Sequence, residues 1–303
     1  MRITQKMMAN QVNSNLSRNV EKLLNTQSHI SSGKRIMRAS DDPVGISKSL
    51  GYHKMLDSMD QYVRNISNAR SGLEAGESAL ADINEVLNRA RELTVAQATG
   101  TASAESRNAA AQEVRQIRDQ LIQLANTKQG DRYLFGGRNT VDQPYNLSTS
   151  SEFQGDGGEF SVMIADGVSM DVAVSGENAF SSVDPLDPLS TIKKDPVVVL
   201  TDLITDLESN NETAISGYLD SLDQVQTQIT NERSNVGARL NRLDSTEAHW
   251  ETYKLNISQM LSDTEDLDLT QAVTDLTAQQ SAYQASLASA SKIIQPSLLD
   301  YLR

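Results

Sequence analysis

The chain has 303 residues, of which 38% are hydrophobic, 4% are aromatic and none is cysteine. The lack of cysteine excludes disulfides, thiolate metal sites and cysteine nucleophiles. Forty acidic against 27 basic residues leave a net charge of −13, which argues against nucleic acid as the main partner, because phosphate binding needs clustered Lys and Arg. So few aromatic residues favour long helices that bury a narrow stripe over a thick globular core.

The charge is unevenly distributed between the two ends of the chain. Residues 1–40 hold seven bases and one acid, whereas residues 261–303 hold six acids and two bases. Such a bias is ordinary on a solvated surface, but it also allows the two ends to pair with each other or with neighbouring subunits.

No stretch approaches the roughly 18 consecutive apolar residues of a membrane span, so we expect no such span. The first 30 residues also lack the apolar segment of a cleaved signal peptide. The protein is therefore expected either to stay in the cytoplasm or to leave it by an uncleaved route.

The first predicted element is an N-terminal amphipathic helix. Its apolar stripe consists of Val12, Leu16, Val20, Leu23 and Ile30. One such helix has little to pack on within its own chain, so we expect the C-terminal helix and identical neighbours to cover this stripe.

The strongest periodic signal predicts a long helix of coiled-coil type over residues 44–99. Asp42 is the expected N-cap, Pro43 the first helical position and Gly100 the end. Twelve apolar or small residues follow strict three-then-four spacing: Tyr52, Met55, Met59, Tyr62, Ile66, Ala69, Leu73, Gly76, Leu80, Ile83, Leu87 and Ala90. A second apolar run, from residue 110 to 124, predicts a shorter helix that folds back.

Residues 141–199 form a turn-rich segment, because they hold four of the six prolines and five of the sixteen glycines. Residues 160–164 and 170–174 alternate partially around the turn signal Asp166-Gly167, which predicts a β-hairpin. We therefore predict a small inserted β-rich domain here.

Two further helices are predicted after this segment. Apolar residues recur every seven positions from Ile215 to Ile257, which indicates a third long helix. The C-terminal stripe, from Leu269 to Ile294, indicates a terminal amphipathic helix. The predicted fold is mainly α: a long coiled-coil-like helical rod of paired N- and C-terminal segments, with the small β-rich insert.

Signals for catalysis or for a cofactor are weak. The three histidines have no histidine partner four residues away, so no metal site is predicted. The acidic run from Asp263 to Asp268 lacks the EF-hand pattern, and helix capping and electrostatics explain it better. Residues 155–158 lack the frame of a phosphate loop, and no serine has the context of a nucleophile elbow. We expect no enzyme and no cofactor; a carbohydrate-acting enzyme within residues 141–199 is the least favoured hypothesis.

Residues 29–36 and 39–45 read HISSGKRI and ASDDPVG, and together they resemble the LSSGxRI…ASDDxxG segment of the bacterial flagellin family. Residues 89–98, RARELTVAQA, are similar to its RVRELAVQ helix, and residues 231–243, NERSNVGARLNRL, to its xxRxxxGAxxNRL segment. The last segment, from Tyr283 to Leu302, also fits. The matches cover roughly the first 140 and the last 100 residues.

Three features are similar to the hook–filament junction members of that family: the start Met1-Arg2-Ile3, the turn at residues 133–137 and the modest insert. The resemblance implies a terminal-helix assembly domain (residues 1–42 plus 262–303), a helical rod domain (43–140 plus 200–261) and an outward-facing insert (141–199). It places the assembly interface at the five N-terminal apolar residues named above and at Arg89, Leu93, Leu276, Tyr283, Leu287, Ile294 and Leu298.

The implied function is structural: a ring of adaptor subunits that joins the hook to the flagellin filament. The implied partners are the first hook-associated protein, flagellin, further copies of the chain and a cytoplasmic export chaperone. The implied location is the extracellular flagellum, reached without a cleaved signal peptide. Filament flagellin itself and a cytoplasmic coiled-coil scaffold remain the alternatives.

Overall fold

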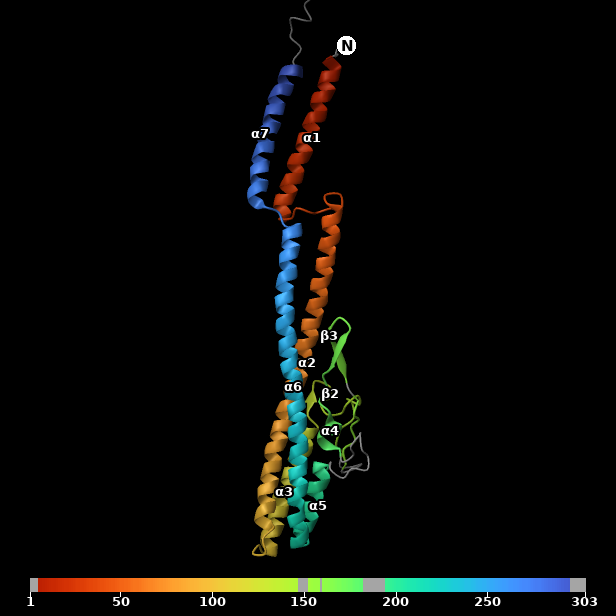
Figure 1. Ribbon diagram of the computed structural model, residues 1–303, viewed down its shortest axis with the longest axis vertical. Helices are drawn as coiled ribbons and strands as arrows, with labels where there is room; N and C mark the ends of the chain where they lie inside the picture. Colours follow the sequence, from red (N-terminus) through yellow and green to blue (C-terminus); the bar gives the residue numbers. More distant parts are fainter. Residues whose placement is uncertain (1–4, 147–151, 159, 182–193, 295–303) are drawn as a thin grey trace, which may run out of the picture. The chain divides into compact units, whose positions relative to one another are not determined.

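The computed structural model describes residues 5–146, 152–158, 160–181 and 194–294. Seven helices and two short antiparallel hairpins make up this part of the chain, which confirms the mainly α fold (Figure 1). The elements are α1 (Gln5–Ser32), α2 (Pro43–Gln97), α3 (Ala104–Ala125), β1 (Lys128–Gln129), β2 (Arg132–Tyr133), β3 (Ser161–Ala165), β4 (Val168–Asp171), α4 (Gly176–Phe180), α5 (Pro196–Glu208), α6 (Glu212–Glu265) and α7 (Leu269–Ile294).

The chain divides into two compact units. Unit 1 comprises Met1–Ser58 and Thr252–Arg303, and unit 2 comprises Met59–Glu251. The long helices α2 and α6 each contribute to both units. The three-domain division expected from the sequence stays a prediction. In the described part of the chain, no helix is both long and apolar enough to cross a membrane.

The start of α2 follows from the predicted capping chemistry. The backbone N–H of Gly45 donates to Asp42 Oδ1 at 2.8 Å, and Pro43 occupies the first helical position, where a missing N–H costs no hydrogen bond. The same dipeptide chemistry starts α5, whose first residues, up to position 199, lie in the segment expected to be turn-rich. Asp195 Oδ1 accepts from the N–H of Val197 at 2.8 Å, and Pro196 is the first residue of the helix.

Unit 2 has one continuous hydrophobic core built from α2, α3, α5 and α6. The coiled-coil stripe of α2 is fully buried at Ile66, Leu73 and Leu80, and the heptad residues of α6 are buried from Ile215 to Leu243. Helix α3 packs on α5 beside them (Figure 1). Heptad spacing therefore identified the buried faces of both long helices in this unit.

The described part of the predicted insert contains the β3–β4 hairpin and α4, and it packs against the helices of unit 2 (Figure 1). Gly167 makes the turn with a φ of +67°. Asn65 Nδ2 and Trp250 Nε1, from α2 and α6, donate to the hairpin carbonyls of Met163 and Ile164, each at 2.8 Å. These two hydrogen bonds attach the backbone of the hairpin to the long helices.

Four aromatic rings of unit 2 pack together: Phe135, Tyr145, Phe153 and Phe180. Phe135 and Phe180 meet edge to face, with centroids 5.1 Å apart, and Tyr145 lies 5.9 Å from Phe180. These rings belong to the same hydrophobic core as the long helices. The Tyr145 hydroxyl donates to buried Asp195 at 2.9 Å, which joins this aromatic cluster to the start of α5.

Candidate functional site

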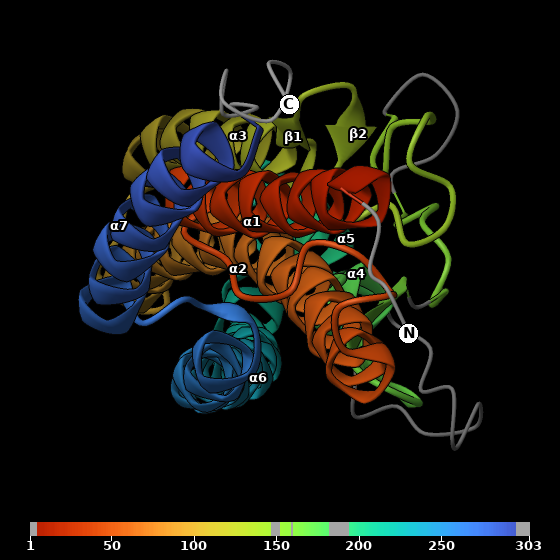
Figure 2. The same ribbon diagram turned by 90° about the horizontal axis from the view of Figure 1, so that it is seen from above.

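The terminal helices α1 and α7 form an antiparallel pair in unit 1 (Figures 1 and 2). Asn19 Nδ2 donates to Ser286 Oγ at 2.9 Å midway along the pair, and the N–H of Leu267 donates to the carbonyl of Gly33 at 2.9 Å at one end. The basic N-terminal and acidic C-terminal segments thus lie next to each other. This arrangement is the one expected if the two ends of the chain pair with each other.

This pair buries very little of its own surface. Among the side chains of α1 and α7 that the structure describes, Ala272 and Ala290 alone are buried, and both belong to α7. Large apolar side chains remain exposed instead: Met7 (62%), Met8 (46%), Leu24 (57%), Leu269 (55%), Val273 (49%) and Leu287 (42%). Two helices without a buried leucine, isoleucine or valine between their described residues have no core, so their order depends on additional cover.

The structure brings most of the predicted terminal interface residues into this pair. Val12, Leu16, Val20, Leu23 and Ile30 on α1 are partly buried. On α7, Leu276 and Tyr283 are partly buried and Leu287 is exposed. Ile294 is the last residue of α7, and Leu298 lies outside the described residues. Their contact with other subunits stays a prediction.

Arg89 and Leu93, the other two predicted interface residues, lie on α2 within unit 2. Arg89 is exposed and pairs with Glu113 of α3, with 2.7 Å between its Nη2 and the carboxylate. Leu93 is partly buried against the hydrophobic core of unit 2. Within the chain, both residues therefore have a packing or pairing role that the sequence did not predict.

The family-like segment at residues 33–45 forms a corner between α1 and α2. Gly33 has a φ of +71°, which a glycine adopts without strain. Asp41 Oδ2 accepts from the N–H of Arg38 at 2.8 Å and of Met37 at 3.1 Å. These backbone hydrogen bonds hold the pKa of Asp41 below its usual value, so the carboxylate stays charged. A Cβ on Gly45 would meet Asp42 and Ile36, so this position leaves no room for a larger residue.

The buried carboxylate of Glu265 organises this corner, and the sequence analysis did not single it out. Its side chain, 8% exposed, pairs with Lys34 and accepts hydrogen bonds from Ser49 Oγ at 2.6 Å and His53 Nε2 at 3.0 Å. Burial alone would raise the pKa of Glu265, but the three polar partners outweigh it and lower the pKa to about 2. One residue thus connects α6, the corner and the first turns of α2.

A sequence signal for Glu265 did exist, because it lies within the acidic run and Lys34 lies within the basic N-terminal segment. Elsewhere in that run, Asp268 caps α7 by accepting from the N–H of Thr270 at 2.9 Å, as the helix-capping interpretation predicted. What distinguishes Glu265 is burial, and the run of acidic residues does not indicate which of their side chains is buried.

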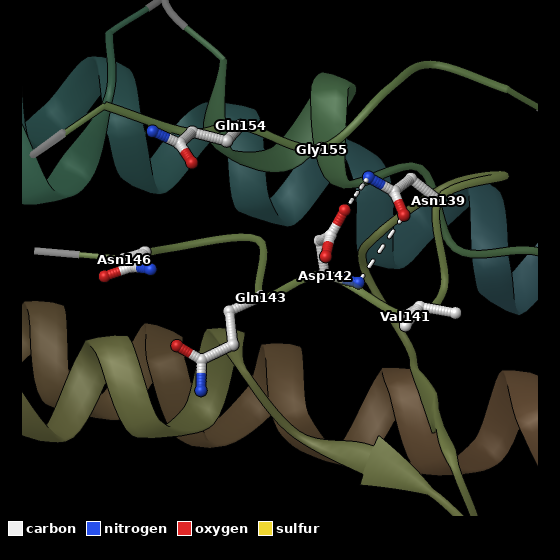
Figure 3. A pocket seen from close by; sticks show the side chains of 7 residues that line it. All are labelled: Asn139, Val141, Asp142, Gln143, Asn146, Gln154 and Gly155. Carbon is white, nitrogen blue, oxygen red and sulfur yellow. Dashed lines mark hydrogen bonds between the residues drawn. The ribbon is translucent and has the colours of Figure 1, made fainter. Parts of the chain in front are cut away.

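The turn-rich segment contains a polar depression of about 360 Å³. Figure 3 shows its lining residues: Asn139, Val141, Asp142, Gln143, Asn146, Gln154 and Gly155. Asn139 Nδ2 donates to Asp142 Oδ2 at 3.0 Å (Figure 3). Asp142 is the one carboxylate among the described residues that line it. Within the described ranges, no three His, Asp or Glu residues are placed to hold a metal ion.

Relatives of known name agree with this architecture. The chain is 26% identical over 305 residues to flagellar hook-associated protein 3 of Escherichia coli K12 and 28% identical over 307 residues to that of Salmonella typhimurium LT2. Each alignment covers 94% of this chain and 95% of the relative. The crystal structure of flagellar hook-associated protein 3 from Legionella pneumophila has the same fold, with a TM-score of 0.62 and 16% identity over 70% of this chain and 97% of that one.

Two family models match most of the chain. The bacterial flagellin N-terminal helical region matches residues 3–140, and the bacterial flagellin C-terminal helical region matches residues 219–302. These ranges contain α1, α2, α3, α7 and most of α6, so they include the uncovered terminal pair and the Glu265 corner. The chain therefore belongs to the bacterial flagellin family.

Proposed function

We propose that this protein is a structural adaptor of the bacterial flagellum, a ring of subunits that joins the hook to the flagellin filament. One observation carries the proposal: the α1–α7 pair leaves six large apolar side chains exposed, and among its described residues only Ala272 and Ala290 are buried. Similarity over nearly the full length to two proteins named flagellar hook-associated protein 3 supports the junction as the location.

Assembly supplies the missing cover in this proposal. A large apolar side chain that becomes fully buried contributes about 1.5–3 kcal/mol. The six exposed side chains of the pair are already partly covered, so their complete burial against neighbours contributes on the order of 5–10 kcal/mol per subunit. This gain favours association with neighbouring subunits, and it comes from the same side chains that lack cover in the isolated pair.

The partners follow from the position at the junction. Copies of the chain pack side by side in the ring, the first hook-associated protein lies on the hook side and flagellin on the filament side. A cytoplasmic export chaperone covers the terminal helices before export, which takes place without a cleaved signal peptide. The role is mechanical and requires no catalysis. The segment 141–199 faces away from the ring axis, and residues 1–42 with 262–303 form the inner assembly domain.

The experiment is localisation of the full chain by electron microscopy, with an antibody against residues 141–199, on flagella from a wild-type and a deletion strain. A single labelled band between hook and filament, together with release of unpolymerised flagellin by the deletion strain, is expected. Label along the whole filament would show a filament flagellin, and the absence of label from flagella would favour a cytoplasmic scaffold.

A pair of point variants tests the terminal helices directly. Leu24→Ser combined with Val273→Ser makes two exposed positions of the pair polar, so the band is expected to weaken or disappear. Val141→Ser is the matched control, because Val141 is 79% exposed in unit 2 and has no role in the pair. Normal bands in the double variant would show that these faces do not drive assembly.

A further inference from the structure

Unit 2 carries a basic and aromatic surface that the proposed function does not yet use. Lys128, Arg132 and Arg138, on and just after the β1–β2 hairpin, are all exposed. The two arginines line a depression of about 350 Å³ together with Tyr133, Phe160 and Val172. We call these six residues the basic–aromatic patch.

Among the residues that the structure describes, no ion pair involves the three cations of the patch. Lys128 Nζ lies instead 4.3 Å from the ring centre of Tyr133, and the guanidinium carbon of Arg132 lies 5.8 Å from that of Phe160. A guanidinium group that lies next to an aromatic ring still has N–H groups at its edge, and these can donate hydrogen bonds to a carboxylate.

One exposed apolar side chain adjoins these cations. Phe160, whose ring centre lies 5.8 Å from the guanidinium carbon of Arg132, is 52% exposed. Arginine beside an exposed aromatic side chain is a composition that protein–protein interfaces favour. The patch therefore has the chemistry of a surface that receives a protein.

We infer that the basic–aromatic patch docks an acidic face of a second copy of this chain. The argument is charge complementarity: the three cations lie in a chain of net charge −13, so the remainder of each copy carries −16 and offers carboxylates to the patch. This inference rests on the proposed function, which places copies side by side.

The charge of the patch also determines the symmetry of the contact. Two basic patches repel each other, so the patch cannot meet itself across a two-fold axis. It meets a different, acidic surface on the next copy. Such a head-to-tail contact repeats from copy to copy and closes into a ring when the rotation allows it. A ring is the arrangement that the proposed function requires.

Site-specific photocross-linking of the full chain tests the inference. Benzoylphenylalanine replaces Gln129, an exposed residue of the depression, in a flagellated strain without its own copy. Irradiation is expected to yield a dimer cross-linked from position 129 to an acidic segment of another copy, as mapped by mass spectrometry. When the chain also carries Arg132→Glu and Arg138→Glu, the yield of the cross-linked dimer is expected to fall at least tenfold. Without these two substitutions, the yield is expected to fall as salt is added.

The matched control makes the same charge change elsewhere on unit 2. Arg64→Glu with Arg242→Glu alters two exposed bases outside the patch and should leave the cross-link unchanged. Circular dichroism verifies that both double variants are folded. A cross-link to a different protein, its absence, or an equal yield in the patch variant would overturn the inference.

Localisation separates the two possible failures. If the chain lies at the hook tip but does not cross-link from position 129 to a second copy, the patch inference fails and the proposed function stands. If the chain is absent from the hook tip, the proposed function fails. A dimer cross-linked from position 129 in the purified chain would then support the patch alone.

Discussion

Asp195 provides a measurable test of how burial and hydrogen bonding compete in unit 2. Its carboxyl group is 3% exposed, and it accepts from the Tyr145 hydroxyl and from the backbone N–H groups of Phe153, Val197 and Val198. Burial raises the pKa of Asp195 from 3.8 to about 6, although the four hydrogen bonds favour the charged form. Between these two pKa values the folded state therefore holds a proton on this carboxyl group that the unfolded state releases.

The sign and size of the effect follow from linkage. Because the folded pKa is the higher one, the contribution of Asp195 to stability is present at low pH and is lost as the pH rises through about 4 to 6. The full span is about 3 kcal/mol, from a shift of about two pKa units. Between pH 5.0 and pH 7.5 the loss is about 1.4 kcal/mol.

The perturbation is Asp195→Asn, which removes the titration and retains a cap acceptor for α5. Urea unfolding followed by fluorescence is the assay, because the single tryptophan, Trp250, lies in unit 2. The free energy of unfolding of the wild type, minus that of the variant, is expected to decrease by about 1.4 kcal/mol from pH 5.0 to pH 7.5. A constant difference would show that Asp195 does not titrate in this range, which is the result expected if its hydrogen bonds outweigh burial and keep the folded pKa at or below 3.8.

Three further changes test other parts of the structure. Glu265→Gln is expected to loosen the corner of unit 1, which would be measured as faster amide hydrogen exchange at residues 33–53. Because the folded pKa of Glu265 is lowered to about 2, the protection of these amides in the wild type should be full above pH 4.5 and fade as the pH falls towards 2. Protection that does not depend on pH would contradict this role. Phe180→Ala removes a fully buried ring and should cost about 3–5 kcal/mol in the same urea assay; a cost below about 1 kcal/mol would mean that the ring is not part of the core. Gly45→Ala places a methyl group against Ile36 and should lower the free energy of unfolding by about 1–3 kcal/mol. Gly51→Ala is the control, because a methyl group there meets no atom within 4 Å. Equal effects of the two changes would refute the steric argument.

Local signals predicted the helical elements well where chemistry and periodicity agree. The three-then-four spacing and the Asp42-Pro43 cap predicted residues 44–99, and the observed helix spans Pro43–Gln97. The identical Asp195-Pro196 signal was not used, because neighbouring prolines and glycines indicated turns. The start of α5 at Pro196 shows that a proline begins a helix as readily as it ends one.

The candidate site was predictable in part. The spacing of apolar residues indicated which faces of α1 and α7 are apolar, and the charge bias indicated that the two ends of the chain could pair. Spacing does not indicate how much of a face is covered. Met55 belongs to the same strict stripe as Ile66, yet Met55 is 47% exposed and Ile66 is fully buried. The covering helices come from distant parts of the chain, and their extent is a property of the packed structure.

By itself the sequence determined the mainly α class, the long helices, the β3–β4 hairpin and the resemblance to flagellins, because these depend on spacing and turn chemistry within a few residues. The tertiary structure alone decided that Glu265 and Asp195 are buried, with pKa shifts of opposite sign, and that Arg132 and Arg138 line one depression. The physical reason is that burial and charge pairing depend on groups far apart in the chain: Glu265 meets Lys34, 231 residues away, and no local pattern records that distance.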